Sequence, residues 1–227
     1  MMTGHISPYH APNFYRDALA KGQHRDIVGG RWEETGKIQM ALLLQEGVLP
    51  QHHFLDVGCG SLRLGCKAVP YLEAGHYWGT DLSADLMAQG YATELLDQVR
   101  LPHAQLVQDS DFSFTGIPDN ITHILAFAVF THLPMNHLRR ALLQIAARFP
   151  NLQKLMFTVF LAPDATASLG PVKQPDGVVT HDIRAPYHVL AEDIFHLCTN
   201  AGFEVKIRPD RLPRGQVLCV AQREPIK

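Results

Sequence analysis

The sequence predicts an α/β fold, on three observations. Short apolar runs typical of buried strands alternate along the chain with segments whose apolar residues recur at helical spacing. A glycine turn follows the first of these runs, as it does at the strand–helix junctions of parallel sheets. The 227 residues, of which 46% are hydrophobic and 19% charged, suffice for one large core or at most two small ones.

The most informative stretch of the chain is residues 54–65. An apolar strand, Phe54–Val57, is expected to be covered on both faces. Gly58 and Gly60 then permit backbone angles and close approaches that a Cβ would block, and Ser61 is placed to cap the following helix. Because backbone N–H groups at a helix start suit a polar or anionic ligand, this turn predicts a site for the polar part of a nucleotide-like cofactor.

Two classes of cofactor compete for such a turn. A dinucleotide fingerprint would need its third glycine at the position of Arg63, but the next glycine is Gly65, so that pattern fails. An acidic residue, Asp56, stands two positions before the first glycine. Its carboxylate would repel a pyrophosphate, whereas it can attract the sulfonium or ammonium of S-adenosylmethionine (SAM).

The stretch Leu55-Asp56-Val57-Gly58-Cys59-Gly60 resembles motif I of the class I SAM-dependent methyltransferases. The resemblance covers about residues 50–225 and implies a three-layer Rossmann-like sandwich. Its sheet would be seven-stranded and mostly parallel, with helices on both faces and a C-terminal antiparallel strand. SAM is then the implied cofactor, and S-adenosylhomocysteine (SAH) is the product.

The remaining elements are expected to alternate in the same way. Pro and Gly residues rule out long regular elements in the loop 161–186, which is expected to be functional or mobile. The expected strands after the first are 77–81, 104–107, 121–127, 152–160, 203–208 and 216–222. The expected helices are 13–19, 38–45, 83–95, 134–149 and 187–201.

A second motif supports the cofactor assignment. Asp81 ends the second expected strand, about twenty residues beyond the glycine turn, where α/β cofactor folds place an acid on the ribose hydroxyls. The resemblance further implies that Asp109 accepts from the adenine amine and that the end of the fourth strand faces the methionine part. The residues expected to bind the cofactor are Asp56, Gly58, Cys59, Gly60, Arg63, Asp81, Leu82, Asp109, Ser110, Ala126 and Phe127.

Residues 1–227 are expected to form one domain, with 1–47 as an N-terminal helical cap on a cofactor-binding core, 48–227. The cap has too few apolar positions for a core of its own. In methyltransferases of this type such a segment often lies over the cofactor, so Arg31 and Trp32 are candidates for binding the acceptor. The alternative interpretation makes Trp32 a packing anchor and Arg31 a surface residue.

Methyl transfer from a sulfonium depends mainly on positioning, but a hydroxyl acceptor also benefits from a base. His132 follows the fourth strand at the sheet edge where α/β folds bind ligands, and His181 lies in the long loop. Both are candidate bases. Alternatively, His132 caps a helix or supports the residues that contact the ligand. Tyr187 and His188, at the end of that loop, are candidates for acceptor binding.

Several classes of function are disfavoured. The net charge of −2, without a block of like charges, argues against a dedicated nucleic-acid surface. The apolar run Ile124–Phe130 is too short to span a bilayer, and the N-terminus lacks signal-peptide features. The four cysteines show no CxxC spacing, as expected of reduced thiols in the cytoplasm. His188, Glu192 and His196 would share one helical face, but no fourth ligand is implied, so no metal is expected.

Three functions remain after these exclusions. The first is a methyltransferase acting on an O or N atom of a small molecule, as a monomer or homodimer without a nucleic-acid or membrane partner. The second is a methyltransferase acting on RNA or protein, which a basic patch beside the pocket would favour. The third is a SAM-binding protein without turnover; Asp56, Gly58, Gly60 and Asp81 argue against loss of cofactor binding but do not prove catalysis.

Overall fold

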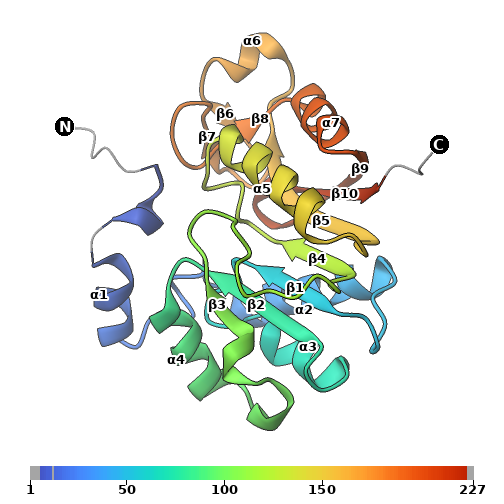
Figure 1. Ribbon diagram of the computed structural model, residues 1–227. Coiled ribbons are helices and arrows are strands. Elements are labelled where there is room, and N and C mark those ends of the chain that lie inside the picture. Colours follow the sequence, from blue (N-terminus) through green and yellow to red (C-terminus); the bar gives the residue numbers. More distant parts are fainter. Residues whose placement is uncertain (1–5, 12, 224–227) are drawn as a thin grey trace. The chain divides into compact units, whose positions relative to one another are not determined.

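The structure is a computed structural model that describes residues 6–11 and 13–223 (Figure 1). The chain divides into two compact units. The N-terminal unit is Pro12–Leu125, and the C-terminal unit is Ala126–Lys227 together with Met1–Ala11, so the boundary falls before the last residue of strand β4 (His123–Ala126). The expected single domain with a cap over residues 1–47 stays a prediction.

The N-terminal unit holds a parallel sheet in the order β3-β2-β1-β4. In this sheet Phe54 of β1 pairs with Tyr77 on one side and with His123 on the other. The elements are α1 (Phe14–Ala20), α2 (Trp32–Gln45), β1 (Phe54–Val57), α3 (Gly65–Tyr71), β2 (Tyr77–Asp81), α4 (Ala84–Glu94), the short η2 (Gln98–Arg100) and η3 (His103–Gln105), β3 (Leu106–Gln108) and β4 (His123–Ala126).

The helix after the glycine turn begins later than predicted. Helix α3 starts at Gly65 with Leu64 as its N-cap, because Leu62 has the left-handed backbone angle φ 64° and cannot belong to a right-handed helix. The predicted capping role of Ser61 is therefore wrong. Its hydroxyl instead donates to the carbonyl of His24 at 2.8 Å.

Helix α4 begins as predicted and packs closely against the glycine turn. The Ser83 hydroxyl accepts from the Leu86 amide at 3.2 Å, so Ser83 is the expected N-cap. One turn before the end of α4, a Cβ at Gly90 would lie 2.2 Å from the carbonyl oxygen of Ser61. Only glycine therefore allows the helix to approach the turn this closely.

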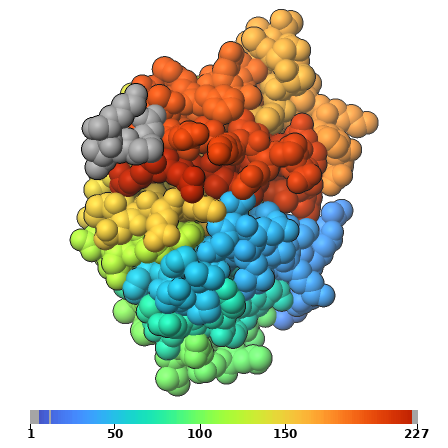
Figure 2. All heavy atoms as spheres, turned by 90° about the vertical axis from the view of Figure 1, so that its right-hand side faces the viewer, coloured from blue at the N-terminus to red at the C-terminus, as the bar shows by residue number. Residues whose placement is uncertain are grey.

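The C-terminal unit is built around antiparallel pairing. Strand β10 lies between β5 and β9 and is antiparallel to both, as predicted for the last two strands, while β8 runs parallel to β5. Figure 2 shows α7, β9 and β10, coloured orange to red, as one continuous part of the surface of this unit. The elements are η1 (Pro8–His10), α5 (Met135–Arg148), β5 (Lys154–Leu161), α6 (Ala165–Ser168), β6 (Val172–Lys173), β7 (Val179–Thr180), β8 (His188–Val189), α7 (Ala191–Asn200), β9 (Phe203–Arg211), η4 (Pro213–Gly215) and β10 (Val217–Arg223).

Within residues 161–186, all of which the structure describes, the regular elements are as short as predicted. They are the four-residue helix α6 and the paired strands β6 and β7. The helix expected over 187–201 begins only at Ala191, because His188 pairs with Phe160 in a strand and the Tyr187 amide donates to the Thr131 carbonyl at 2.8 Å. Strand pairing thus replaces the first turn that the apolar spacing predicted.

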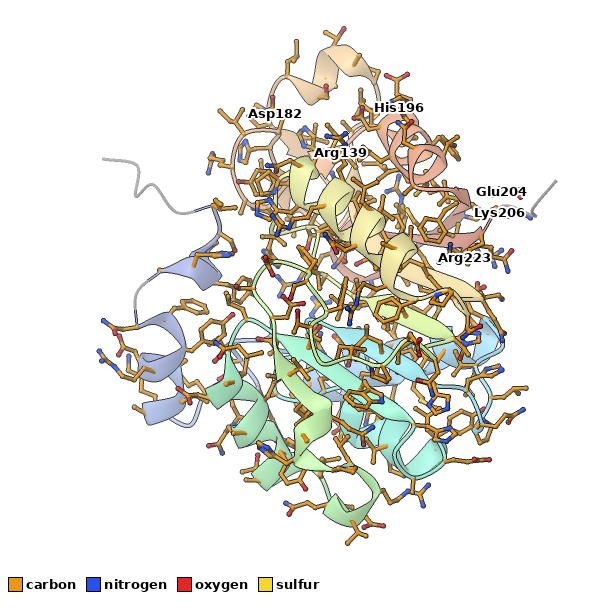
Figure 3. The ribbon with its side chains drawn as sticks, in the orientation of Figure 1. Arg139, Asp182, His196, Glu204, Lys206 and Arg223 are labelled. Carbon is orange, nitrogen blue, oxygen red and sulfur yellow. The ribbon has the colours of Figure 1, made fainter. Side chains whose placement is uncertain are left out.

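This change removes the histidine face that the sequence placed on one helix. His188 is buried in β8, whereas His196 is exposed on α7 (Figure 3), where its Nε2 lies 2.9 Å from the amide nitrogen of Asn200. Among the described residues, no group of three or more His, Cys, Asp or Glu side chains could hold a metal ion. In the same part of the chain, no helix is long and apolar enough to cross a membrane.

Candidate functional site

The amides of the glycine turn are used inside the N-terminal unit. Those of Gly58 and Cys59 both donate to the Thr80 carbonyl, at 2.7 and 3.0 Å. The amide of Gly60 donates to Oδ2 of Asp81 at 2.9 Å. These three amides are therefore not free for an anionic ligand, and the turn is not built as a phosphate cradle. The expected site for the polar part of a cofactor stays a prediction.

Two glycines are required by the geometry of the turn. Gly58 and Gly60 have backbone φ angles of 72° and 56°, a region that residues with a Cβ rarely adopt. A Cβ on Gly60 would also lie 2.7 Å from Cγ1 of Val28. The side chain of Val28, far away in sequence, thus occupies the space that the missing Cβ leaves.

Asp81 lies at the carboxyl end of β2, as predicted, and its carboxylate holds the turn. Oδ2 accepts from the Gly60 amide and Oδ1 from the Ser83 amide, both at 2.9 Å. Burial raises the pKa of this carboxyl, and its backbone hydrogen bonds oppose that rise. A carboxylate has about four acceptor sites, so the backbone bonds leave it able to accept from ribose hydroxyls. The geometry of Asp81 therefore fits a nucleoside cofactor.

Asp56, the other acid of the motif, is buried in β1 beside β2. The hydroxyl of Tyr77 donates to its Oδ2 at 2.8 Å. Burial, with a smaller effect from the charge of Asp81, raises the pKa of Asp56 to about 7, against the lowering effects of Tyr77 and Arg63. Near neutral pH this side chain is therefore divided between the carboxylate and the acid. Its expected attraction for a cofactor cation stays a prediction.

Arg63 joins the turn to the segment before α2. Its Nη1 donates to the carbonyl of Val28 at 2.8 Å and to that of Gly30 at 3.4 Å, and its Nε donates to Oε1 of Gln39 at 3.2 Å. The side chain is buried within the N-terminal unit. Its expected contact with the cofactor stays a prediction, and its observed contacts are structural.

The two residues predicted to meet the acceptor from the cap differ in exposure. Arg31 is exposed and precedes α2 in the left-handed conformation, φ 46°. Trp32, the first residue of α2, is buried, and the guanidinium carbon of Arg25 lies 5.1 Å from the centre of its ring. These contacts are those of a packing anchor, so acceptor binding by Arg31 and Trp32 stays a prediction.

The segment after β3 is organised by Asp109. One carboxylate oxygen accepts from the amides of Asp111 and Ser113, at 3.1 and 3.2 Å, and the other accepts from the amide of Phe114 at 2.8 Å. Asp109 thus shapes its own loop, as Asp often does in turns, and its predicted bond to adenine would have to share these oxygens. Ser110 is exposed in this loop.

Leu82 links the second and third strands through its backbone. Its carbonyl accepts from Nε2 of Gln108 at 2.9 Å, which ties the residue after β2 to the end of β3. Cys59 is buried, and Gly79 lies against it, since a Cβ there would be 2.9 Å from the cysteine Sγ. The ends of β1, β2 and β3 are thus tied together in the N-terminal unit.

In the C-terminal unit, a buried polar chain fixes the turn that follows β4. The amide of Ala128, which has the left-handed angle φ 59°, donates to Oγ1 of Thr158 at 2.7 Å. That hydroxyl donates to Oε1 of Gln216 at 2.6 Å. Ala126 and Phe127, the predicted cofactor residues just before this turn, are both buried.

His132 lies four residues after Ala128, in the same turn region. The ring of Tyr9 meets its imidazole edge-on, with ring centres 4.9 Å apart. Burial, with a smaller effect from the charge of Arg214, lowers the pKa of His132 to about 4. The imidazole is therefore neutral near pH 7 and can accept a proton, although only as a weak base.

The other candidates of the C-terminal unit are held by hydrogen bonds. The hydroxyl of Tyr187 donates to the carbonyl of Ile6 at 2.9 Å. Both ring nitrogens of His188 are engaged, with Oγ1 of Thr180 at 3.0 Å and the carbonyl of Ser168 at 2.9 Å. These bonds give His188 a structural role in joining α6 and β7 to β8, so its predicted acceptor contact stays a prediction.

His181 lies on the backbone ladder beside Tyr187. Its amide donates to the carbonyl of Pro186 at 2.9 Å, and its own carbonyl accepts from the His188 amide at 3.0 Å. Burial and the charge of Arg184 lower the pKa of its imidazole. This shift favours the neutral imidazole, and the predicted role of His181 as a base is not tested by these contacts.

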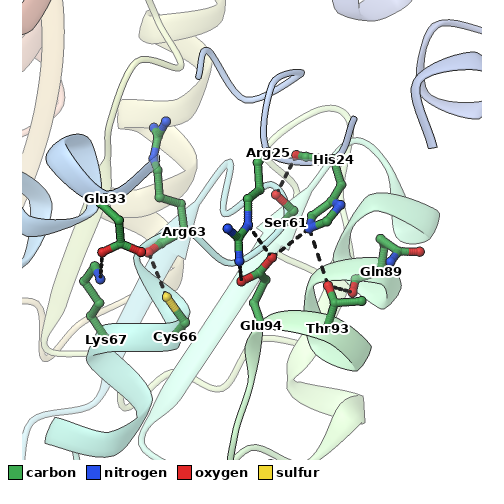
Figure 4. A network of polar contacts seen from close by, with 10 residues as sticks. All are labelled: His24, Arg25, Glu33, Ser61, Arg63, Cys66, Lys67, Gln89, Thr93 and Glu94. Atoms are coloured by element: carbon green, nitrogen blue, oxygen red, sulfur yellow. Dashed lines mark hydrogen bonds and ion pairs between the residues drawn. The ribbon is translucent and has the colours of Figure 1, made fainter. Parts of the chain in front are cut away.

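One cluster in the N-terminal unit was not predicted from the sequence. The carboxylate of Glu94 accepts from Nε and Nη2 of Arg25, both at 2.8 Å, and lies 2.7 Å from Nε2 of His24 (Figure 4). The Arg25 guanidinium holds the pKa of Glu94 below its usual range. These residues are too far apart in sequence to form a local pattern, so periodicity carried no signal for them.

Comparison with known proteins identifies the class of the fold. Residues 55–149 match the sequence model of a family described as "Methyltransferase domain". The chain carries a methyltransferase domain. This match starts within the stretch 54–65 and confirms both the resemblance stated from it and the cofactor of that class, SAM.

Solved structures show the same fold at low sequence identity. The magnesium protoporphyrin IX methyltransferase of Synechocystis PCC 6803 with bound SAH has a TM-score of 0.63 and 16% identity, over 96% of this chain and 97% of that one. A TehB-like SAM-dependent methyltransferase from Corynebacterium glutamicum has a TM-score of 0.58 and 15% identity, over 94% and 100%. The pyocyanin biosynthetic protein PhzM has a TM-score of 0.58 and 17% identity, over 95% and 60%. The predicted Rossmann-like fold, a mostly parallel sheet with an antiparallel edge, is confirmed.

Proposed function

We propose that the methyltransferase domain transfers the methyl group of SAM to an O or N atom of a small molecule. The observation that carries this proposal is the Asp81 carboxylate, held at the end of β2 by one backbone amide on each oxygen. This geometry presets the carboxylate before ligand arrives, and preorganisation favours binding because less order is lost.

The glycine turn supports the same choice of cofactor. The amides of Gly58, Cys59 and Gly60 are already bonded inside the unit, so they have little to offer a pyrophosphate. SAM has no phosphate group, whereas NAD requires such amides. We therefore expect SAM and SAH to bind and NAD not to bind.

The small-molecule acceptor rests on charge and on the similar structures. The net charge of −2, without a block of like charges, argues against a dedicated nucleic-acid surface. The similar structures include proteins named for magnesium protoporphyrin IX and for pyocyanin biosynthesis, both small molecules. The residues of this domain would then act mainly by holding the acceptor in line with the methyl group of SAM. That methyl group is bound to a sulfonium sulfur, so SAH is a good leaving group.

His132 is the side chain that we assign to proton transfer from a hydroxyl acceptor. It is neutral near pH 7 because its pKa is lowered to about 4. A base this weak contributes less than one with a pKa near the working pH. An amine that arrives neutral needs no base, so the proposal includes both acceptor types.

Calorimetric titration tests the cofactor, and transfer of a labelled methyl group from SAM into a metabolite extract tests the acceptor. We expect heat of binding with SAH, none with NAD, and label in a small molecule. For a hydroxyl acceptor, His132→Gln should lower the rate by about 10²-fold, the low end for a general base because this base is weak, and leave the affinity for SAH intact. Failure of SAM and SAH to bind at millimolar concentration would refute the proposal.

A further inference from the structure

The glycine turn is covered by a segment that precedes α2, which we call the strap, residues 24–31. Hydrogen bonds and side-chain packing join the strap to the turn. The hydroxyl of Ser61 donates to the carbonyl of His24 at 2.8 Å, and Nη1 of Arg63 donates to that of Val28 at 2.8 Å. Val28 also fills the space beside Gly60, where a Cβ would lie 2.7 Å from its Cγ1. The strap thus contacts three of the residues between β1 and α3.

The turn depends on these contacts as well as on its bonds to Thr80 and Asp81, because α3 begins only after it. Helix α3 begins only at Gly65, and Leu62 lies in the left-handed region at φ 64°. The hydroxyl of Ser61 is bonded to the strap, and its backbone lies against α4, where a Cβ at Gly90 would come within 2.2 Å of the Ser61 carbonyl oxygen. The conformation of the turn is therefore set by these neighbours together with its bonds to Thr80 and Asp81.

Glu94 fastens the strap to α4, one helical turn beyond Gly90. Its carboxylate accepts two bonds from the guanidinium of Arg25, both at 2.8 Å, and contacts Nε2 of His24 at 2.7 Å (Figure 4). The Glu94 side chain is only 6% exposed. Two parallel bonds to one guanidinium fix direction as well as distance, and partial burial protects such a pair from screening by salt.

The position of Glu94 indicates a specific role. It is the last residue of α4, where the negative end of the helix dipole disfavours a carboxylate. Arg25 and His24 supply the compensating donors from the strap, and the Arg25 guanidinium also lies over the ring of Trp32, 5.1 Å from its centre. The acid at this site is therefore stabilised only while the strap is in place.

We propose that Glu94 is a positioning residue for cofactor binding: by holding the strap through Arg25 and His24, it keeps the glycine turn in the conformation that binds SAM. The inference rests on the proposed function for its ligand. It also requires that strap and turn open together, which can be measured without any ligand.

The test compares Glu94→Gln with the matched control Glu33→Gln. Glu33 also pairs with a cation of the N-terminal unit, Lys67 at 3.1 Å, but its side chain is 66% exposed, so this pair is expected to contribute little. We expect Glu94→Gln to weaken SAH binding by roughly tenfold, since the loss of one charge-assisted hydrogen bond changes an equilibrium constant by about this factor. Glu33→Gln should change the affinity by less than about twofold.

Amide hydrogen exchange of the ligand-free protein supplies the second readout. Glu94→Gln should raise exchange at residues 24–31 and at 59–63 together, and Glu33→Gln should raise neither. If Glu94→Gln lowers only the melting temperature, with affinity for SAH and protection of the turn unchanged, Glu94 is a packing residue and the inference is wrong.

The experiment also distinguishes two further outcomes: a wild-type protein that does not bind SAH, and a Glu94→Gln variant that does not fold. If the wild-type protein fails to bind SAH, the proposed function fails, while the exchange measurement still decides whether Glu94 holds the turn. If Glu94→Gln does not fold, Arg25→Lys replaces it, because the Arg25 side chain is 53% exposed and the change keeps its charge but removes the paired geometry. Arg25→Lys should shift both readouts in the same direction by a smaller factor, and an unchanged result contradicts the inference.

Discussion

At the scale of single residues, two buried acids at the ends of neighbouring strands differ in their partners. Asp81 accepts from two backbone amides, whereas Asp56 has the hydroxyl of Tyr77. Backbone amides at a fixed distance support a carboxylate strongly, and a single neutral hydroxyl supports it less. We therefore expect Asp81 to act as a carboxylate toward the cofactor and Asp56 to take up a proton near neutral pH.

Replacing Asp81 with alanine should weaken SAH binding by more than it lowers stability. Each charge-assisted hydrogen bond to the ribose is worth ~1.5–3 kcal/mol. Some loss of stability is also expected, because the amides of Gly60 and Ser83 lose their acceptor. Calorimetry of SAH binding and urea unfolding of the same samples compare the two effects. Normal SAH affinity in a folded variant would mean that Asp81 does not hold the ribose.

Asp56 should make the stability of the protein fall as the pH rises. The folded pKa of Asp56 is raised from 3.8 to about 7, so the native state binds more protons than the unfolded state between these values. The free energy of unfolding therefore decreases with pH across this window, by up to about 1.4 kcal/mol per unit from this group.

Asp56→Asn should remove this contribution while keeping an acceptor for the Tyr77 hydroxyl. The stability of the variant relative to wild type is then expected to rise between pH 4 and pH 7. Urea unfolding at several pH values measures it, with the exposed Asp17→Asn as control. A difference that stays constant over this range would show that Asp56 is ionised throughout.

At the scale of elements, hydrogen bonds from neighbouring strands fix the conformation of the turn after β4. Ala128, Thr158 and Gln216 come from that turn, from β5 and from the start of β10, and they form one buried chain of hydrogen bonds. Ala128 keeps a left-handed φ of 59°, which non-glycine residues hold only where their surroundings enforce it. The turn that carries Phe127 and His132 is thus fixed by a hydroxyl on another strand.

Thr158→Val should destabilise the protein by about 2–5 kcal/mol, since it leaves the Ala128 amide and the Gln216 oxygen buried without this partner. Valine has nearly the same shape, so the loss would report the hydroxyl and not packing. Urea unfolding measures the effect, and Thr199→Val, on the exposed face of α7, is the control with an expected change within about 0.5 kcal/mol. Equal stability of both variants would show that the chain contributes nothing.

At the scale of the whole molecule, chemistry-bearing residues occur in both units. The glycine turn, Asp56 and Asp81 belong to the N-terminal unit, and His132 and Tyr187 belong to the C-terminal unit. The matched residues 55–149 begin in the first and end in the second. The net charge of −2 is small for this size, in keeping with the proposed preference for small acceptors over polyanions.

The sequence by itself determined the fold class, the glycine turn and the acid at Asp81. These features depend on short-range spacing: an apolar run sets a buried strand, and a glycine sets a backbone angle, whatever lies elsewhere in the chain. The family match over residues 55–149 confirms the class that this local pattern predicted.

Tertiary structure alone decided which side chains meet. The helical spacing around residue 190 predicted a longer α7, but pairing with β5 drew His188 into a strand and engaged both of its ring nitrogens. Arg25 and Glu94 are 69 residues apart, and Ser61 and His24 are 37 apart. Contacts of this kind leave no periodic trace in a sequence, because they form only when packing brings distant segments together.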